Sequence, residues 1–244
     1  MTGAISGGGS AQGPGNIGTP VDSRQPIGFH RPIVAFDFDG TLTTRDSFTA
    51  FLRWRAGPAR YVAGLGGLTP ELVNYLFKRD RGRIKAAAAL KFLGRASRDE
   101  IETWARNFAE SHARRLLRPD AVKAWRYWRD RGARLTIVTA SPEEIVAPFA
   151  RGLGADLLLG SRLAFDADGR FTGKLEGDNC RGQEKVRRLR QAYGEDMRLE
   201  AAYGDTEGDK AMLTVAEEAG YRVFSGRPGG LEGERRKLRR PRPI

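Results

Sequence analysis

The strongest constraint on the fold is a series of short, largely apolar runs that end at acidic or hydroxyl side chains and are separated by helical segments. Three such runs occupy residues 32–36, 135–138 and 200–203. Apolar runs of this length that stop at turn-forming or polar residues are typical of buried strands. Because strands that alternate with helices form mostly parallel sheets covered on both faces, we expect a doubly wound α/β fold.

One interval between these runs is too long for a single crossover helix. Residues 46–118 carry apolar side chains at helical spacing, with a helix-start signal at 69–71 and a capping box at 97–100. We therefore expect this interval to form an inserted helical cap. The core domain would then comprise residues 30–45 and 119–226.

The remaining chain carries signals for several further helices and strands. Glycines and proline mark most of their ends, and an Asp-Ala-Asp-Gly turn marks a hairpin. The expected elements are a helix over 121–131, a helix that starts with Ser141 as its cap and Pro142 in its first turn, two strands over 157–176, a helix over 181–193, a helix over 209–219 and a strand over 221–224.

The two ends of the chain have biased compositions. Residues 1–29 are rich in Gly, Ser and Pro, so we expect them to be disordered, and residues 227–244 are expected to form a basic flexible tail. The 244 residues include 42 basic and 30 acidic side chains, a net charge of +12. The last 18 residues hold seven basic and two acidic side chains, so the tail supplies five of these charges. The rest indicates a solvated basic surface, and we expect no nucleic-acid binding.

The composition also excludes several kinds of chemistry and location. A single cysteine, Cys180, rules out an internal disulfide and a multi-cysteine zinc site, and two histidines leave little room for histidine-based catalysis. No apolar stretch is long enough to span a membrane, and the N-terminal residues lack the pattern of a secretory signal. We therefore expect a cytoplasmic protein whose chemistry depends on carboxylates, Lys, Arg and Ser or Thr.

Polar side chains follow three of the predicted strands at the point where each strand ends. Asp37 and Asp39 follow the first, Thr139 follows the second, and Asp205 and Asp209 follow the third. Ligands of open α/β sheets bind beyond the carboxyl ends of the strands, so these groups should meet at one edge. Four carboxylates together would repel one another unless a cation lay among them, and a set of hard oxygen ligands favours Mg²⁺.

At these positions the chain resembles a known enzyme family. The segments DFDGTLT, VTASP and YGDTEGDKAML, together with Lys185 at the start of a helix, resemble in order and spacing the four motifs of the haloacid dehalogenase-like (HAD) phosphatases. A helical insert directly after the first motif resembles the small cap of the phosphoserine-phosphatase-like branch. The resemblance covers about residues 31–226.

The resemblance implies a role for each residue of the first and last motifs. Asp37 would be the nucleophile that forms an aspartyl-phosphate, and Asp39 the general acid and base. Mg²⁺ would be held by the carboxylates of Asp37 and Asp205 and by the backbone carbonyl of Asp39. Asp209 would orient a metal-bound water or Lys185.

The other two motifs would hold the phosphoryl group, and the cap would select the leaving group. Thr139, Ala140 and Lys185 are the expected phosphate contacts. Asp46, nine residues after Asp37, stands where phosphoserine phosphatases carry a Glu that meets the substrate amino group. The expected function is therefore Mg²⁺-dependent hydrolysis of a small phosphate ester, as in phosphoserine phosphatases.

Three alternatives remain open at this point. Residues 51–83 mix aromatic, apolar and basic side chains, which would suit a weak peripheral membrane contact and a lipid phosphatase. Some phosphatidylglycerophosphate phosphatases resemble this branch. The same residues could instead form the interior of the cap, which is the simpler interpretation. A basic binding protein with an inactive core and a dehalogenase fit less well, because Asp39 and Asp205 are the residues that metal-assisted phosphoryl transfer requires.

Overall fold

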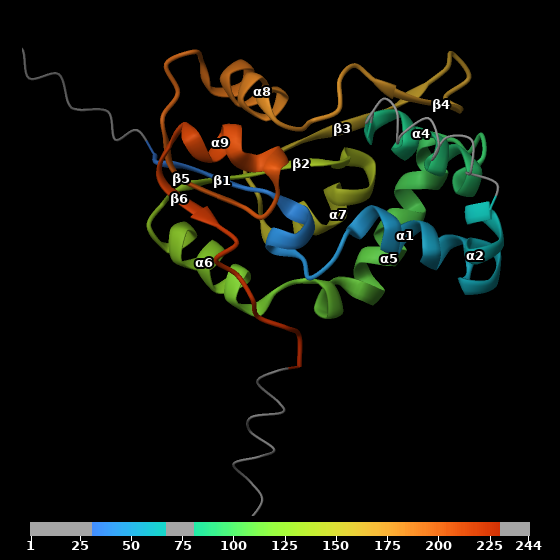
Figure 1. Cartoon of the computed structure of the whole chain (residues 1–244), viewed down its shortest axis with the longest axis horizontal. Coiled ribbons are helices and arrows are strands. Elements are labelled where there is room, and N and C mark those ends of the chain that lie inside the picture. Colours follow the sequence, from blue (N-terminus) through green and yellow to red (C-terminus); the bar gives the residue numbers. More distant parts are fainter. Residues whose placement is uncertain (1–30, 67–80, 230–244) are drawn as a thin grey trace, which may run out of the picture. The chain divides into compact units, whose positions relative to one another are not determined.

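The computed structural model describes residues 31–66 and 81–229, and its centre is a six-stranded sheet (Figure 1). The strand order is β4-β3-β2-β1-β5-β6, and every neighbouring pair is parallel except β3 and β4. The strands are β1 Ile33–Phe36, β2 Arg134–Pro142, β3 Leu157–Phe165, β4 Phe171–Glu176, β5 Leu199–Gly204 and β6 Ala216–Tyr221. The expected doubly wound α/β fold is confirmed.

The central strand β1 is buried on both faces, and each face packs against its own group of helices. Phe36 faces one side, where it contacts Trp125 with ring centroids 5.0 Å apart. Ala35 faces the other side and packs in a second cluster that includes Leu189 and Met212. Alternation of side chains along a strand therefore divides the interior into two layers.

The helices follow the same division (Figure 1). Helices α6 and α7 contribute to the Phe36 side, whereas α8 and α9 contribute to the Ala35 side. Helices α1, α2, α4 and α5 come between β1 and α6 in the chain. The helices are α1 Ser47–Ala56, α2 Pro58–Gly66, α4 Arg81–Leu93, α5 Arg98–Leu116, α6 Pro119–Asp130, α7 Glu143–Leu153, α8 Gln183–Tyr193 and α9 Lys210–Thr214.

The chain leaves the sheet for these four helices, here called the insert, and returns from them at one crossing. Thr43 and Leu117 form an antiparallel bridge there. The N–H of Thr44 donates to the Leu116 carbonyl at 2.8 Å, and the N–H of Arg118 donates to the Leu42 carbonyl at 2.9 Å. The division of the chain into a core and a cap with the bounds given above stays a prediction, as do the tails at 1–29 and 227–244, most of which lie outside the described residues.

Two local signals are confirmed, and one lies outside the described residues. The Ser97 hydroxyl accepts from the N–H of Glu100, and the Glu100 carboxylate accepts from the N–H of Ser97, which completes the expected capping box. The turn between β3 and β4 contains Gly169 with a φ of +71°. The helix start expected at 69–71 falls in the part of the chain that is not described.

Two expectations about element ends are wrong. The last strand is Ala216–Tyr221 rather than 221–224, and the helix before it ends at Thr214 rather than at 219. Pairing with β5 outweighs the helical propensity of the Ala- and Glu-rich segment at 216–219. Arg222 then adopts a left-handed φ of +55°, which ends the strand.

Ser141 does not cap α7, because β2 continues to Pro142 and the helix has no side-chain cap.

Candidate active site

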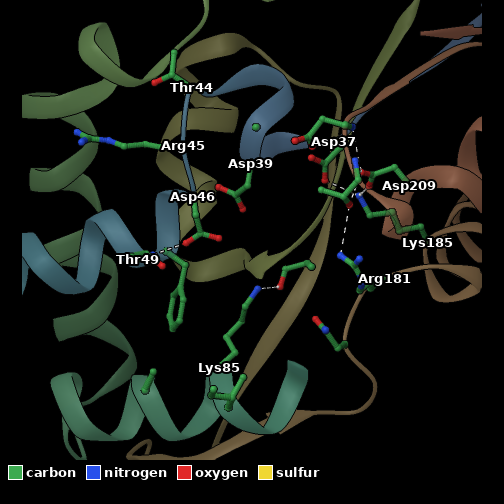
Figure 2. Close-up of a pocket in the computed structure, with 18 of the residues that line it drawn as sticks. Asp37, Asp39, Thr44, Arg45, Asp46, Thr49, Lys85, Arg181, Lys185 and Asp209 are labelled. Carbon is green, nitrogen blue, oxygen red and sulfur yellow. Dashed lines mark hydrogen bonds and ion pairs between the residues drawn. The ribbon is translucent and has the colours of Figure 1, made fainter. Parts of the chain in front are cut away.

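Most of the polar residues that follow the strands meet in one pocket of about 680 Å³ at the carboxyl edge of the sheet (Figure 2). The sheet supplies residues from the ends of β1 and β5, helix α8 supplies Lys185, and the insert supplies the opposite wall from α1 and α4. Residues named in the sequence analysis that line the pocket are Asp37, Asp39, Asp46, Ala140, Lys185, Asp205 and Asp209.

The loop after β1 approaches the loop after β5 closely enough to require a glycine. Gly40 has a φ of +85°, a conformation that side chains rarely adopt. A Cβ atom at this position would also overlap the Asp205 carboxylate. The Thr41 hydroxyl donates to Asp205 Oδ1 at 3.4 Å and so fixes the same contact.

Lys185 is 1% exposed and uses all three of its ammonium hydrogens. It donates to Asp37 Oδ1 at 2.6 Å, to Asp209 Oδ1 at 2.7 Å and to the Val138 carbonyl at 2.6 Å. Burial alone would lower the pKa of Lys185, but the two carboxylates outweigh that effect and raise it. Lys185 is therefore a fixed positive charge at the end of β1 and β2.

The surroundings of Asp37 disfavour the ionised form of its carboxyl group. Burial raises its pKa to about 7, although Lys185 opposes the shift, and the charges of Asp209 and Asp39 add to it. Burial also raises the pKa of Asp205, which is half-exposed. Burial and the nearby Asp46 carboxylate raise the pKa of Asp39. The carboxylates that follow β1 and β5 thus carry more negative charge than Lys185 compensates.

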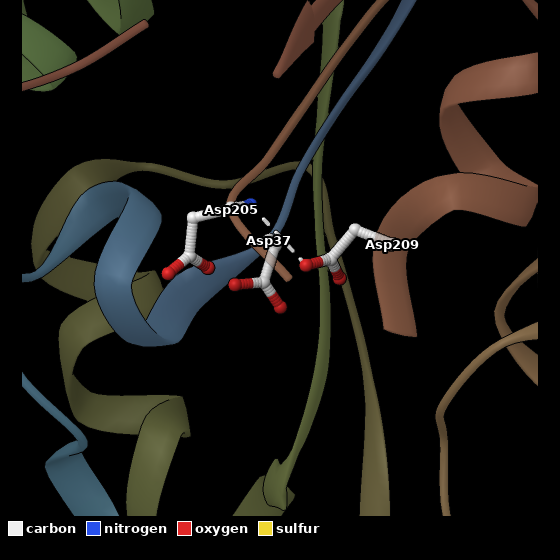
Figure 3. Close-up of side chains that lie close together, drawn as sticks. All are labelled: Asp37, Asp205 and Asp209. Atoms are coloured by element: carbon white, nitrogen blue, oxygen red, sulfur yellow. Dashed lines mark hydrogen bonds between the residues drawn. The ribbon is translucent and has the colours of Figure 1, made fainter. Parts of the chain in front are cut away.

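This excess negative charge fits a divalent cation. The carboxylates of Asp37, Asp205 and Asp209 each offer an oxygen, and these oxygens all lie within 4.8 Å of one another (Figure 3). Hard oxygen donors are the ligands that Mg²⁺ and similar ions prefer. Asp37 and Asp205 are the better candidates, since Asp209 is already committed to hydrogen bonds.

Both carboxylate oxygens of Asp209 accept hydrogen bonds from the protein. Oδ1 accepts from Lys185, and Oδ2 accepts from the N–H groups of Asp205 and Thr206 at 3.2 and 2.8 Å and from the Thr206 hydroxyl at 2.8 Å. Burial would raise the pKa of Asp209, but Lys185 and these hydrogen bonds lower it. This bonding supports the expectation that Asp209 orients its neighbours.

Of the remaining predicted phosphate and substrate residues, Ala140 and Asp46 line the pocket and Thr139 does not. Thr139 is fully buried, its hydroxyl accepts from the N–H of Ser141 at 3.0 Å, and it does not line the pocket. Ala140 does line it. Asp46 lines the pocket and also caps α1, because its Oδ1 accepts from the N–H of Thr49 at 2.6 Å.

Several residues at the site were not predicted from the sequence, and Lys85 and Ser141 make the contacts that matter most for the proposals below. Lys85, on α4, donates to the Ala140 carbonyl at 2.7 Å and lies 5.6 Å from the Phe48 ring centroid. Burial lowers its pKa, while the Asp39 and Asp46 carboxylates oppose that shift. Ser141 donates its hydroxyl to Asp39 Oδ2 at 2.5 Å. A lysine on the Ala-rich face of a predicted helix was the only signal for Lys85.

Comparison with known proteins agrees with this geometry. A family model described as haloacid dehalogenase-like hydrolase matches residues 34–214. The chain belongs to this family of hydrolases. The match covers the loops after β1 and β5 and Lys185, and it therefore includes the carboxylate pocket. The protein is an enzyme of this family, and phosphatases are among its relatives.

The relatives include proteins of similar length. The chain is 61% identical over 200 residues to the protein CicA of Caulobacter vibrioides, covering 82% of this chain and 90% of that one. It is 29% identical over 196 residues to a phosphoserine phosphatase of Halobacterium salinarum, covering 77% and 83%. A crystal structure of a protein of unknown function from Bordetella pertussis Tohama I shares the fold, with a TM-score of 0.62, 23% identity and coverage of 85% and 96%.

None of the helices within residues 31–66 and 81–229 is both long and apolar enough to cross a bilayer.

The raised pKa of Asp37 predicts that this residue destabilises the metal-free protein as pH rises. A carboxyl group whose pKa is higher in the folded than in the unfolded chain lowers the free energy of unfolding between about pH 4 and pH 7. Asp37→Asn should therefore become more stable relative to the wild type by about 1–3 kcal/mol between pH 5 and pH 8.

Urea denaturation in EDTA measures this difference at each pH. Excess Mg²⁺ should reduce it at pH 8, because a bound cation offsets the Asp37 charge. A difference that stays constant from pH 5 to pH 8 would show that the buried charge of Asp37 does not strain the fold.

Proposed function

We propose that this protein is a Mg²⁺-dependent phosphomonoester hydrolase that acts on a small phosphorylated metabolite through an aspartyl-phosphate on Asp37. The observation that carries the proposal is the convergence of Asp37, Asp39 and Lys185 beside the Asp205 carboxylate. The expected cytoplasmic location belongs to the same proposal. Mg²⁺ bound by Asp37, Asp205 and the Asp39 carbonyl would offset the repulsion between Asp37 and an incoming phosphate dianion.

The first step transfers the phosphoryl group to the protein. A carboxylate oxygen of Asp37 attacks phosphorus, and the bond from phosphorus to the ester oxygen breaks with its electron pair on that oxygen. The Asp39 carboxyl group gives its proton to the same oxygen, so the leaving group departs as a neutral alcohol. Asp39 is then a carboxylate.

The second step releases inorganic phosphate. Asp39 takes a proton from water while the water oxygen attacks phosphorus. The bond between phosphorus and the Asp37 oxygen breaks, and its electron pair restores the Asp37 carboxylate. Lys185, with a backbone donor contributed by Ala140, would stabilise the charge on the phosphoryl oxygens in both steps, whereas the buried Thr139 does not reach the pocket.

The outer part of the pocket supports a small, polar leaving group. Asp46 and Lys85 carry opposite charges, and both lie on the insert side of the pocket (Figure 2). Lys85 forms no ion pair with any described residue, so an acidic group of the substrate would compensate its partly buried charge. An amino or hydroxyl group would suit Asp46. Phosphoserine, phosphoethanolamine, histidinol phosphate, sugar phosphates and phosphatidylglycerophosphate form the panel that identifies the substrate by phosphate release.

Replacing the proposed nucleophile should abolish turnover. Asp37→Asn keeps the size of the side chain but removes the attacking carboxylate, so p-nitrophenyl phosphate hydrolysis should fall by at least about 10³-fold. EDTA should stop the wild-type enzyme, and Mg²⁺ should restore it. Asp130→Asn, on an exposed position of α6 away from the pocket, is the matched control and should retain full activity. Turnover by a clean Asp37→Asn preparation would exclude Asp37 as the nucleophile.

Lys85 should affect binding of the leaving group more than chemistry. Lys85→Met keeps an apolar stem against Phe48 but loses the charge. KM for a substrate with an acidic leaving group, such as phosphoserine, should rise about tenfold, while kcat for p-nitrophenyl phosphate stays within about twofold. Lys91→Met makes the same change on an exposed position of α4 and serves as the control. Equal effects on both substrates would show that Lys85 has a structural role instead.

One observation favours a lipid phosphate as a second candidate substrate. On α2, Val62 is 69% and Leu65 46% exposed, and the exposed residues Arg53, Arg55 and Arg60 lie on α1 and α2. The two apolar side chains are therefore not interior residues of the insert, in contrast to Tyr61, which stacks on Phe92 at 4.9 Å. A basic and apolar helix surface suits an anionic membrane.

Vesicle sedimentation tests this second candidate. The wild type should bind phosphatidylglycerol vesicles, and a Val62→Ser/Leu65→Ser variant should bind about tenfold more weakly at moderate salt, because it loses apolar contact. Val223→Ser removes a 55% exposed apolar side chain elsewhere and is the control. Binding that disappears in salt and does not depend on Val62 and Leu65 would indicate charge attraction alone.

A further inference from the structure

We propose that Ser141 and the backbone N–H of Ser47 position the Asp39 carboxyl group for proton transfer. The inference rests on the proposed function, in which Asp39 is the group that exchanges protons with the leaving group and with water. Ser141 and Ser47 are thus positioning residues that act through Asp39.

Each oxygen of the Asp39 carboxyl group has its own donor. The Ser141 hydroxyl donates to Oδ2 at 2.5 Å, and the N–H of Ser47 donates to Oδ1 at 2.6 Å. The two donors come from different elements, since Ser141 lies near the end of β2 and Ser47 is the first residue of α1. Two bonds from separate elements fix both the position of the carboxyl group and the rotation about its Cβ–Cγ bond.

Ser141 is fully buried, and its hydroxyl is committed to this contact. It does not cap α7, and its own N–H donates to the Thr139 hydroxyl. A buried hydroxyl needs a hydrogen-bond partner, and Asp39 is the one that the described residues provide. The geometry therefore connects Ser141 to the proton-transfer group and not to the helix that follows it.

The two donors differ in a way that suits a group that changes its protonation state. A hydroxyl can donate or accept, whereas an N–H can only donate. Ser141 can therefore stay bonded to Asp39 when the carboxyl group is ionised and when it carries a proton on Oδ2. The N–H of Ser47 keeps Oδ1 as an acceptor in both states. The carboxyl group can remain in place through both steps of the proposed reaction.

The experiment compares two leaving groups that differ in their need for a proton. Glycerol phosphate releases an alcohol, which must be protonated as it leaves, whereas p-nitrophenyl phosphate releases a stable anion. In Ser141→Ala, kcat/KM should fall about 10–100-fold for glycerol phosphate and less than about threefold for p-nitrophenyl phosphate. The value of kcat/KM depends only on the steps up to departure of the leaving group. Hydrolysis of the aspartyl-phosphate therefore does not affect it.

Two variants separate this role from a structural one. Ser141→Thr keeps the hydroxyl and should restore most of the glycerol phosphate activity. Thr136→Val removes a different buried hydroxyl from β2, one that bonds Tyr193 at 2.6 Å, and should leave the ratio of the two substrates unchanged. An equal fall for both substrates in Ser141→Ala would overturn the inference, because it would indicate phosphate binding or a general loss of structure.

The backbone donor provides an independent test that also serves if Ser141→Ala fails to fold. Proline has no N–H and is tolerated at the first position of a helix, which Ser47 occupies. The preceding residue, Asp46, has φ −57° and ψ 116°, a backbone conformation that suits a following proline. Ser47→Pro should reproduce the selective loss on glycerol phosphate, and Ser47→Ala, which keeps the N–H, should not. Equal behaviour of these two variants contradicts the inference. A wild-type protein that hydrolyses neither of these esters nor any member of the phosphate-release panel would instead refute the proposed function, and the inference with it.

Discussion

The site depends on the buried ammonium group of Lys185. A charge with 1% exposure is stable only if hydrogen bonds and opposite charges compensate it, and Lys185 has both. Its partners are Asp37 after β1, the Val138 carbonyl on β2 and Asp209 after β5. One side chain from α8 thus joins three strand ends. Because the Lys185 ammonium group must keep these partners, Asp37, Lys185 and Asp209 occupy fixed positions before any ligand binds.

The same arrangement leaves the pocket with an uneven distribution of charge. Asp209 accepts four hydrogen bonds and its pKa is lowered, whereas burial raises the pKa values of Asp37, Asp39 and Asp205. The protein itself therefore stabilises the ionised form of Asp209, whereas the partners of Asp37, Asp39 and Asp205 do not offset the effect of burial. In the proposed mechanism, a divalent cation would compensate the charges of Asp37 and Asp205. Asp39, which has two hydrogen-bond donors, would exchange a proton instead.

The sequence predicted those parts of the site that depend on local pattern. Asp37, Asp39 and Asp205 follow strands, and the parallel sheet brings strand ends together, so their meeting could be expected. Lys85 and Ser141 could not, because their contacts join residues 55 and 102 positions apart. Ser141 followed by Pro and Glu has the local pattern of a helix start, but the tertiary contact with Asp39 determines its role. The last strand was predicted at 221–224 instead of Ala216–Tyr221 for the same reason, since pairing with β5 outweighs the helical preference of residues 216–219.

Asp37 and Asp39 are only two residues apart, yet different parts of the chain hold them. The partner of Asp37 is Lys185, which is bonded entirely to the sheet and the loops beside it. One oxygen of Asp39 is bonded to α1, the first helix of the insert. The Arg118 guanidinium, where the chain returns from the insert, donates to the carbonyls of Gly40 and Thr43 at 3.1 Å each and ties the loop to that crossing. A shift of the insert against the sheet would therefore disturb Asp39 while leaving the bonds of Asp37 intact. In the proposed mechanism, proton transfer is thus the step that would depend on the position of the insert.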